Sequence, residues 1–172
     1  MKTILLAVAL VLVPSLAFAQ DGMSINGVFY RLGMTRAEVL AATPKEVDIQ
    51  DLAKGGPTGS LMFSIQRRSD FHELLGSIDL TDGRVSRIVR PIGVFDKPEA
   101  YEVGKALVDG FARIKQDNSA AEIAIRSEVQ APDFGGETKV ITLTYGRRQI
   151  RIVVPEAGKR LSMTIEEILR LP

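Results

Sequence analysis

Large apolar residues alternate with mostly smaller or polar ones in the middle of the chain. Between Ser60 and Gln66, Leu61, Phe63 and Ile65 fall on one face of an extended segment. A period of two is typical of a strand that is buried on one side only. The pattern therefore predicts a half-buried strand over residues 60–66.

Two further strand segments follow it. Residues 75–81 and 85–91 are rich in apolar and β-branched side chains, and Asp82-Gly83 separates them. This dipeptide favours a tight hairpin, because both turn positions need a positive φ that glycine adopts easily. The sequence predicts a three-strand antiparallel meander.

A helix start precedes the meander. Thr35 stands at the N-cap position, and Glu38 follows at the spacing that lets its carboxylate reach back to the cap. Pro44 disfavours the helical conformation in the residue before it. We predict a helix over 36–43, a short strand over 28–32, and a loop over 45–59 that contains a short second helix at 47–53.

The second half of the chain repeats this order. Asp96, Pro98 and Glu99 again provide cap chemistry. Apolar residues then recur at spacings of three and four, which predicts a helix from Glu99 to near Asp117. The members of this apolar stripe are Ala100, Val103, Leu107, Phe111 and Ile114.

Strand patterns return after this helix. Residues 122–130, 138–145 and 149–154 are rich in β-branched side chains, and Gly146-Arg147 marks the turn between the last two. The tail over 160–171 alternates like a strand, although Thr164 and Glu167 have the spacing of a capping box. We favour a strand with a frayed end.

These elements predict an α+β fold, with antiparallel sheets that carry helices packed on one face. The order of elements suggests two units, each a capped helix followed by a meander. We expect a first unit over residues 20–93 and a second over 94–172.

The first residues have the pattern of a targeting signal. Lys2 precedes an apolar run from Ile4 to Val13, and Ala17-Phe18-Ala19 has the form of a cleavage site. The run is half the roughly twenty residues that span a membrane as a helix. We predict a signal peptide over residues 1–19, a mature chain that begins at Gln20 without a transmembrane segment, and a periplasmic or secreted location.

Composition narrows the chemistry. Lys plus Arg total 22 against 21 acidic residues, so the formal charge of +1 gives no global field for nucleic acid. The chain has no cysteine, which excludes disulfides, thiol nucleophiles and lipid attachment at a cysteine. We therefore expect no cofactor, no metal and no nucleic-acid partner.

His72 is the only histidine, and Asp70 and Glu73 are close to it in the sequence. These residue types provide general bases and metal ligands. We expect His72 in a turn between strands. The alternative to a role as base or ligand is that His72 is simply a solvated residue of this turn. We predict no catalytic residue.

Arginines are the other candidates. Ideal strand alternation places Arg84 and Arg90 on the face of Ile88, and Arg87 on the face of Val85. The alternative to a common binding stripe is that these charges solvate the sheet and discourage aggregation. The candidate partner-binding residues are Arg67, Arg68, Arg84, Arg87 and Arg90.

Several of these motifs resemble one known family. Leu32-Gly33-Met34-Thr35, Glu38-Val39, Pro44 and the hairpin Asp82-Gly83-Arg84-Val85 resemble the SmpA/OmlA small outer-membrane-assembly proteins over residues 28–92. The resemblance implies a β-lactamase-inhibitor-protein-like architecture that binds other proteins through the open face of its sheet, without catalysis.

The sequence thus favours an exported, non-enzymatic binding protein of the bacterial cell envelope, whose partner is another envelope or extracellular protein. One alternative is a periplasmic carrier with a small ligand between the 99–115 helix and its sheet. Another is an envelope hydrolase that uses His72. The pattern does not specify an oligomeric state.

Overall fold

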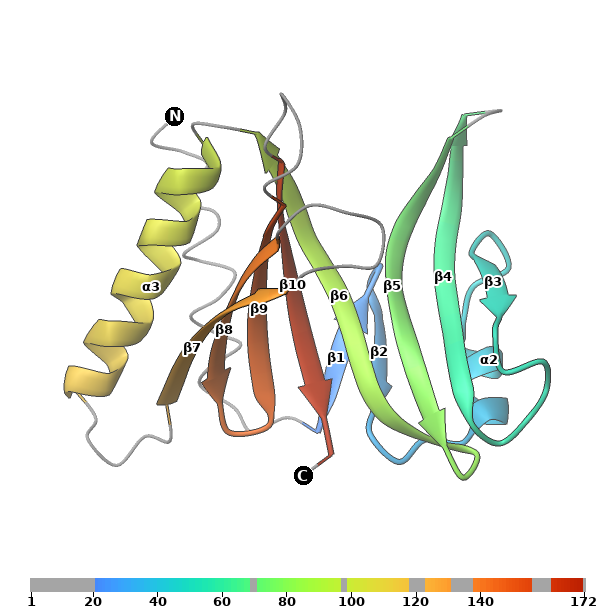
Figure 1. The fold of residues 1–172 in the computed structure, drawn as a ribbon. Coiled ribbons are helices and arrows are strands. Elements are labelled where there is room, and N and C mark those ends of the chain that lie inside the picture. Colours follow the sequence, from blue (N-terminus) through green and yellow to red (C-terminus); the bar gives the residue numbers. More distant parts are fainter. Residues whose placement is uncertain are drawn as a thin grey trace. The chain divides into compact units, whose positions relative to one another are not determined.

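The computed structural model describes residues 21–68, 71–96, 99–117, 123–130, 138–155 and 162–171. Within these ranges the chain forms ten strands and two helices (Figure 1). The predicted signal peptide lies outside the described residues. The elements are β1 (Gly22–Ile25), β2 (Val28–Arg31), α2 (Arg36–Ala42), β3 (Asp48–Asp51), β4 (Gly59–Arg68), β5 (Phe71–Thr81), β6 (Arg84–Asp96), α3 (Glu99–Asp117), β7 (Ile123–Gln130), β8 (Thr138–Tyr145), β9 (Arg148–Pro155) and β10 (Ser162–Arg170).

Eight of the strands join in one sheet, in the order β3-β4-β5-β6-β10-β9-β8-β7, and β1 and β2 form a separate hairpin. The predicted α+β class is therefore wrong. The described chain is mostly strand, with two short helices of 7 and 19 residues. Local patterns do not reveal that the tail strand β10 inserts between the two predicted meanders, or that the strands extend into segments expected to be loops.

Most individual elements agree with their predictions. Both predicted helices are present as α2 and α3. The strands expected over 60–91 and 122–154 are found as β4, β5, β6, β7, β8 and β9. The tail is a strand, as favoured. The short helix predicted at 47–53 is wrong, because residues 48–51 are β3, an edge strand that pairs with β4.

The chain divides into two compact units. We call residues 21–91 with 166–171 the N-terminal unit, and residues 92–165 the C-terminal unit. Strands β6 and β10 contribute residues to both. Each unit has its own apolar core.

In the N-terminal unit, the β1–β2 hairpin and α2 pack on one face of β4, β5 and β6 (Figure 1). Gly76 on β5 makes this close approach possible, because a Cβ there would lie 3.0 Å from Ile25 Cδ1 and 2.5 Å from the Val89 carbonyl oxygen. The most deeply buried residues of this core include Ile25, Tyr30, Val39, Leu61, Phe63, Ile78, Leu80 and Ile88.

In the C-terminal unit, three residues of the α3 stripe, Val103, Leu107 and Phe111, belong to the same apolar core as the strand residues Leu143, Ile150 and Ile152. Val103, Leu107 and Phe111 of the helix are each at most 5% exposed. They pack with the strand residues in one apolar cluster.

Local chemistry accounts for the starts and turns. Thr35 Oγ1 accepts from the Glu38 amide at 3.3 Å, and Glu38 Oε2 accepts from the Thr35 amide at 2.7 Å, which completes the predicted capping box. Asp82 and Gly83 have φ values of 51° and 76°. Two positive φ values in succession match the hairpin turn expected between β5 and β6.

Candidate functional site

The core residues of β4, β5 and β6 point toward α2 and the β1–β2 hairpin, so the alternate residues point the other way. We call this other side the outer face of the N-terminal unit. Residues that stand opposite each other in neighbouring strands share a face. The register therefore places these residues on the outer face: Ser60, Met62, Leu74, Ser77, Asp79 and Arg87.

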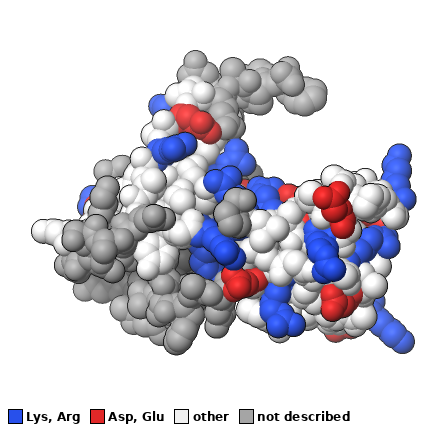
Figure 2. Space-filling model, turned by 90° about the horizontal axis from the view of Figure 1, so that it is seen from below, with Lys and Arg blue, Asp and Glu red and all other residues white. Residues whose placement is uncertain are grey.

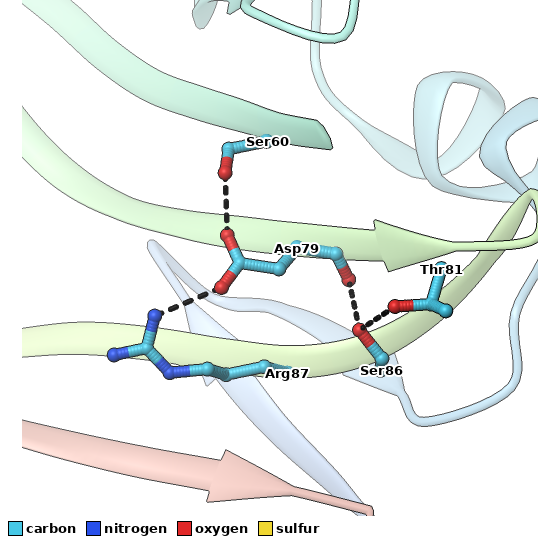
Figure 3. Close-up of polar contacts among 5 residues, drawn as sticks. All are labelled: Ser60, Asp79, Thr81, Ser86 and Arg87. Carbon is cyan, nitrogen blue, oxygen red and sulfur yellow. Dashed lines mark hydrogen bonds and ion pairs between the residues drawn. The ribbon is translucent and has the colours of Figure 1, made fainter. Parts of the chain in front are cut away.

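A row of hydrogen bonds crosses the outer face over three strands (Figure 3). Asp79 on β5 accepts from Ser60 Oγ on β4 at 2.6 Å and from Arg87 Nη1 on β6 at 2.8 Å. The Asp79 side chain is 27% exposed and the Arg87 side chain 37%. Partial burial and two hydrogen-bond partners hold the carboxylate in one orientation.

A β-bulge lies beside this row. Asp79 pairs with Arg87 but Leu80 pairs with Val85, so Ser86 is an extra residue in β6. Ser86 Oγ donates to the Asp79 carbonyl at 3.2 Å and accepts from Thr81 Oγ1 at 3.0 Å (Figure 3). The bulge stabilises its own geometry through these contacts.

The bulge also changes which residues share a face. Val85 and Ile88 are both fully buried in the core, although ideal alternation places them on opposite faces. The predicted sharing of a face by Arg87 and Val85 is therefore wrong. The extra residue shifts the alternation by one, which turns Arg87 to the outer face and Val85 into the core.

The structure separates Arg87 and Arg90, two of the candidate arginines. Arg87 lies on the outer face with Asp79. Arg90 Nη1 donates to the Ser24 carbonyl of β1 at 3.2 Å, and its Nη2 pairs with Glu167 on β10. The Glu167 side chain is only 3% exposed. Arg90 therefore neutralises a buried carboxylate on the core side of the sheet.

Two of the other candidates, Arg67 and Arg84, also have local partners. Arg67 Nε lies 2.6 Å from Glu73 Oε2, and Arg84 Nη1 donates to the Gly33 carbonyl at 3.0 Å. Arg68 belongs to β4, but its side chain is outside the described atoms. Figure 2 shows basic side chains next to acidic ones on the face that it presents. The structure thus does not gather the five arginines into one basic stripe.

His72 lies near the start of β5, opposite Gln66, so its predicted position in a turn is wrong. Its Nδ1 is 3.6 Å from Asp48 Oδ2, and the two side chains are 52% and 62% exposed. At this distance the contact is longer than a hydrogen bond. Over the described ranges, no group of three or more acidic or histidine side chains has the spacing of a metal site.

Arg36, the first residue of α2, forms an ion pair with Asp51 at the end of β3. Burial raises the pKa of Asp51, but hydrogen bonds from Arg36 and from the Gly55 amide at 3.0 Å outweigh it. The net pKa lies below the ordinary value of 3.8. This pair connects the helix start to the end of β3 and the loop after it.

Asp79 and Ser60 were not among the site residues predicted from the sequence. Asp79 stands between Ile78 and Leu80, where a polar residue in an alternating segment marks the solvent side of a strand. That signal places Asp79 on the outer face, but its partners become visible only with the register of β4 and β6.

None of the described helices is long and apolar enough to cross a membrane. Comparisons with protein-family models, with curated proteins and with solved structures found no match.

Proposed function

We propose that this protein is an exported, non-enzymatic binding protein of the bacterial cell envelope, and that it contacts another protein through the outer face of the N-terminal unit. The row of Ser60, Asp79 and Arg87 carries this proposal. It holds charged and polar groups in place on a sheet face that is opposite the unit's own hairpin and helix.

An ordered polar row favours protein contact for an entropic reason. Association costs free energy when mobile side chains become fixed, and side chains that are already held by hydrogen bonds avoid part of this cost. Apolar side chains supplement the row on the same face, where Leu74 is 48% exposed. Apolar contact beside satisfied polar groups is the usual composition of a protein interface.

The alternatives have less support from the geometry. A carrier needs space for its ligand between the helix and the sheet. In the C-terminal unit, Val103, Leu107 and Phe111 of α3 instead pack with the sheet residues in one apolar core. A hydrolase needs a base that hydrogen bonds hold in one orientation. The His72 side chain is half-exposed and lies beyond hydrogen-bond distance of Asp48. Protein contact through the outer face therefore remains the preferred function.

Site-specific photo-crosslinking tests the surface. A photoreactive residue at Leu74 is expected to give one defined protein adduct in intact cells, and Arg87→Glu in the same chain to abolish it. The matched control carries the photoreactive residue at Ala41, an exposed position of α2 on the opposite side of the sheet. Equal adducts from both positions, or recovery of a small molecule instead of a protein, would contradict the proposal.

Export has a separate test. Mass spectrometry of the protein recovered from the periplasm or medium is expected to find Gln20 as its first residue. A full-length protein confined to the cytoplasm would refute export while leaving the binding surface to the crosslinking experiment.

A further inference from the structure

Strand β7 ends the strand order of the sheet, so one of its two sides lacks a strand neighbour among the described elements. Such an edge presents backbone N–H and C=O groups that pair readily with another strand. All residues from Ala124 to Val129 are exposed, and Ile125 and Val129 are 45% and 57% exposed. Within the described part of the chain, this edge is apolar in part and has no strand on its outer side.

The two edges of the sheet differ in their protection. Edge strand β3 has four residues, of which Asp48 and Asp51 are charged. By contrast, β7 has eight residues without proline or lysine, and it pairs with β8 in unbroken register from Ile123 to Gln130. Short length, proline, charged side chains and bulges keep edges apart. β7 is long and has neither proline nor a bulge, and its two charged residues, Arg126 and Glu128, are of opposite sign.

The side chains of β7 are self-complementary. Ile125, Ser127 and Val129 lie on one face of the strand, and Arg126 and Glu128 on the other. Two antiparallel copies related by a twofold axis must place one residue opposite its own copy. The two registers with the greatest overlap therefore centre on Arg126 or on Ser127.

Charge decides between these registers. Centring on Arg126 places two guanidinium groups opposite each other, which is unfavourable. Centring on Ser127 places Arg126 opposite Glu128 of the second copy, and Ile125 opposite Val129, and each of these pairs forms twice. Glu128 already interacts within its own chain, and the second copy adds a further basic neighbour.

We propose that β7 is a homodimerisation edge, at which two copies of this chain pair antiparallel with Ser127 on the twofold axis. The contact lies wholly in the C-terminal unit and is separate from the outer face of the N-terminal unit. Its occupant is a second copy, because the order of charge and apolar residues in β7 complements itself.

Cysteine substitution tests the register, because the chain has no native cysteine. In the proposed dimer, Ser127→Cys brings two Cα atoms to about 5 Å, a distance that a disulfide spans. The matched control is Ala124→Cys, whose copy lies six residues along the strand from the facing position, or roughly 20 Å away. Oxidation is expected to link the first variant and not the second.

Charge exchange tests the pairing in solution. Sedimentation velocity over a concentration series is expected to show a dimer that Arg126→Glu or Glu128→Arg alone weakens by roughly tenfold or more, because each variant faces like charges. A mixture of these two variants restores unlike pairs at both positions, as does the double variant. Loss of folding does not produce such rescue.

A protein that stays monomeric throughout the series would overturn the proposal. Equal crosslinking of the two cysteine variants, or failure of the mixed charge variants to associate, would do the same. None of these results depends on the envelope partner, so they do not bear on the proposed function.

Discussion

The ion pair between Arg90 and Glu167 joins β6 to β10 inside the N-terminal unit, and breaking it tests how the tail strand is held. Arg90→Met removes the guanidinium group but keeps an unbranched apolar side chain. The carboxylate of Glu167, whose side chain is 3% exposed, then stays buried without its cation. We expect a large loss of folding stability.

The magnitude follows from the burial of the two partners. Removing one member of a buried ion pair typically costs about 3–5 kcal/mol. Arg90 is 27% exposed, and Glu167 has a further interaction in the chain, so both features moderate the loss. The contact from Arg90 to the Ser24 carbonyl at 3.2 Å is lost as well. We expect a decrease of about 3 kcal/mol in the free energy of unfolding.

Urea denaturation monitored by circular dichroism measures this decrease in the free energy of unfolding. The control is Arg67→Met, because its pair with Glu73 is 53% and 46% exposed, and such pairs contribute less than about 1 kcal/mol. The double variant Arg90→Met with Glu167→Leu is expected to have a free energy of unfolding within about 1 kcal/mol of the unchanged protein, because the apolar replacement removes the buried charge. Equal losses for Arg90→Met and Arg67→Met, or no recovery in the double variant, would refute the reasoning.

Three further predictions concern stability, and each is read from urea midpoints. Asp79→Ala removes the acceptor of the row in Figure 3 and is expected to cost about 1 kcal/mol; a neutral result would mean that the row is not ordered in solution. Gly76→Ala places a Cβ 2.5 Å from the Val89 carbonyl oxygen and is expected to lower the free energy of unfolding by about 2 kcal/mol or more. Gly110→Ala in α3 has open space around it and is expected to raise the free energy of unfolding by about 0.5–1 kcal/mol. Hydrogen bonds from Thr35 hold the pKa of Glu38 below its ordinary value of 4.5 in the folded protein. The stability that Glu38 contributes is therefore complete above pH 4.5 and is lost as the pH falls through the pKa of the folded state. Glu38→Gln is expected to flatten this loss of stability in acid, and an unchanged pH profile would contradict the role of Glu38 in the cap.

Local sequence signals were sufficient for most elements. The capping pair of Thr35 and Glu38 and the Asp82-Gly83 turn depend on atoms a few residues apart, so the sequence alone predicts them. The fold class depends on which strands become neighbours. The same alternating pattern in β10 suits an edge position or a central one, and only tertiary pairing decides.

The candidate site shows the same limit. Strand alternation correctly placed Arg87 on the face opposite Ile88, but the bulge at Ser86 moved Val85 away from Arg87 and into the core with Ile88. This bulge has no clear signature in the sequence, because its extra residue is an ordinary serine. The partners of Asp79 come from β4 and β6, and their register is set by hydrogen bonds between strands.

The position of β10 in the sheet has a consequence for biosynthesis. β10 is the last strand that the structure describes, yet it lies between β6 and β9. On the ribosome β9 emerges shortly before β10, but β6 emerges long before it, so β6 keeps an unpaired side until translation of residues 162–170 is complete. Pairing over such sequence separations is slow. Nascent chains are therefore expected to depend on chaperones, and products truncated before residue 162 to be degraded or to aggregate.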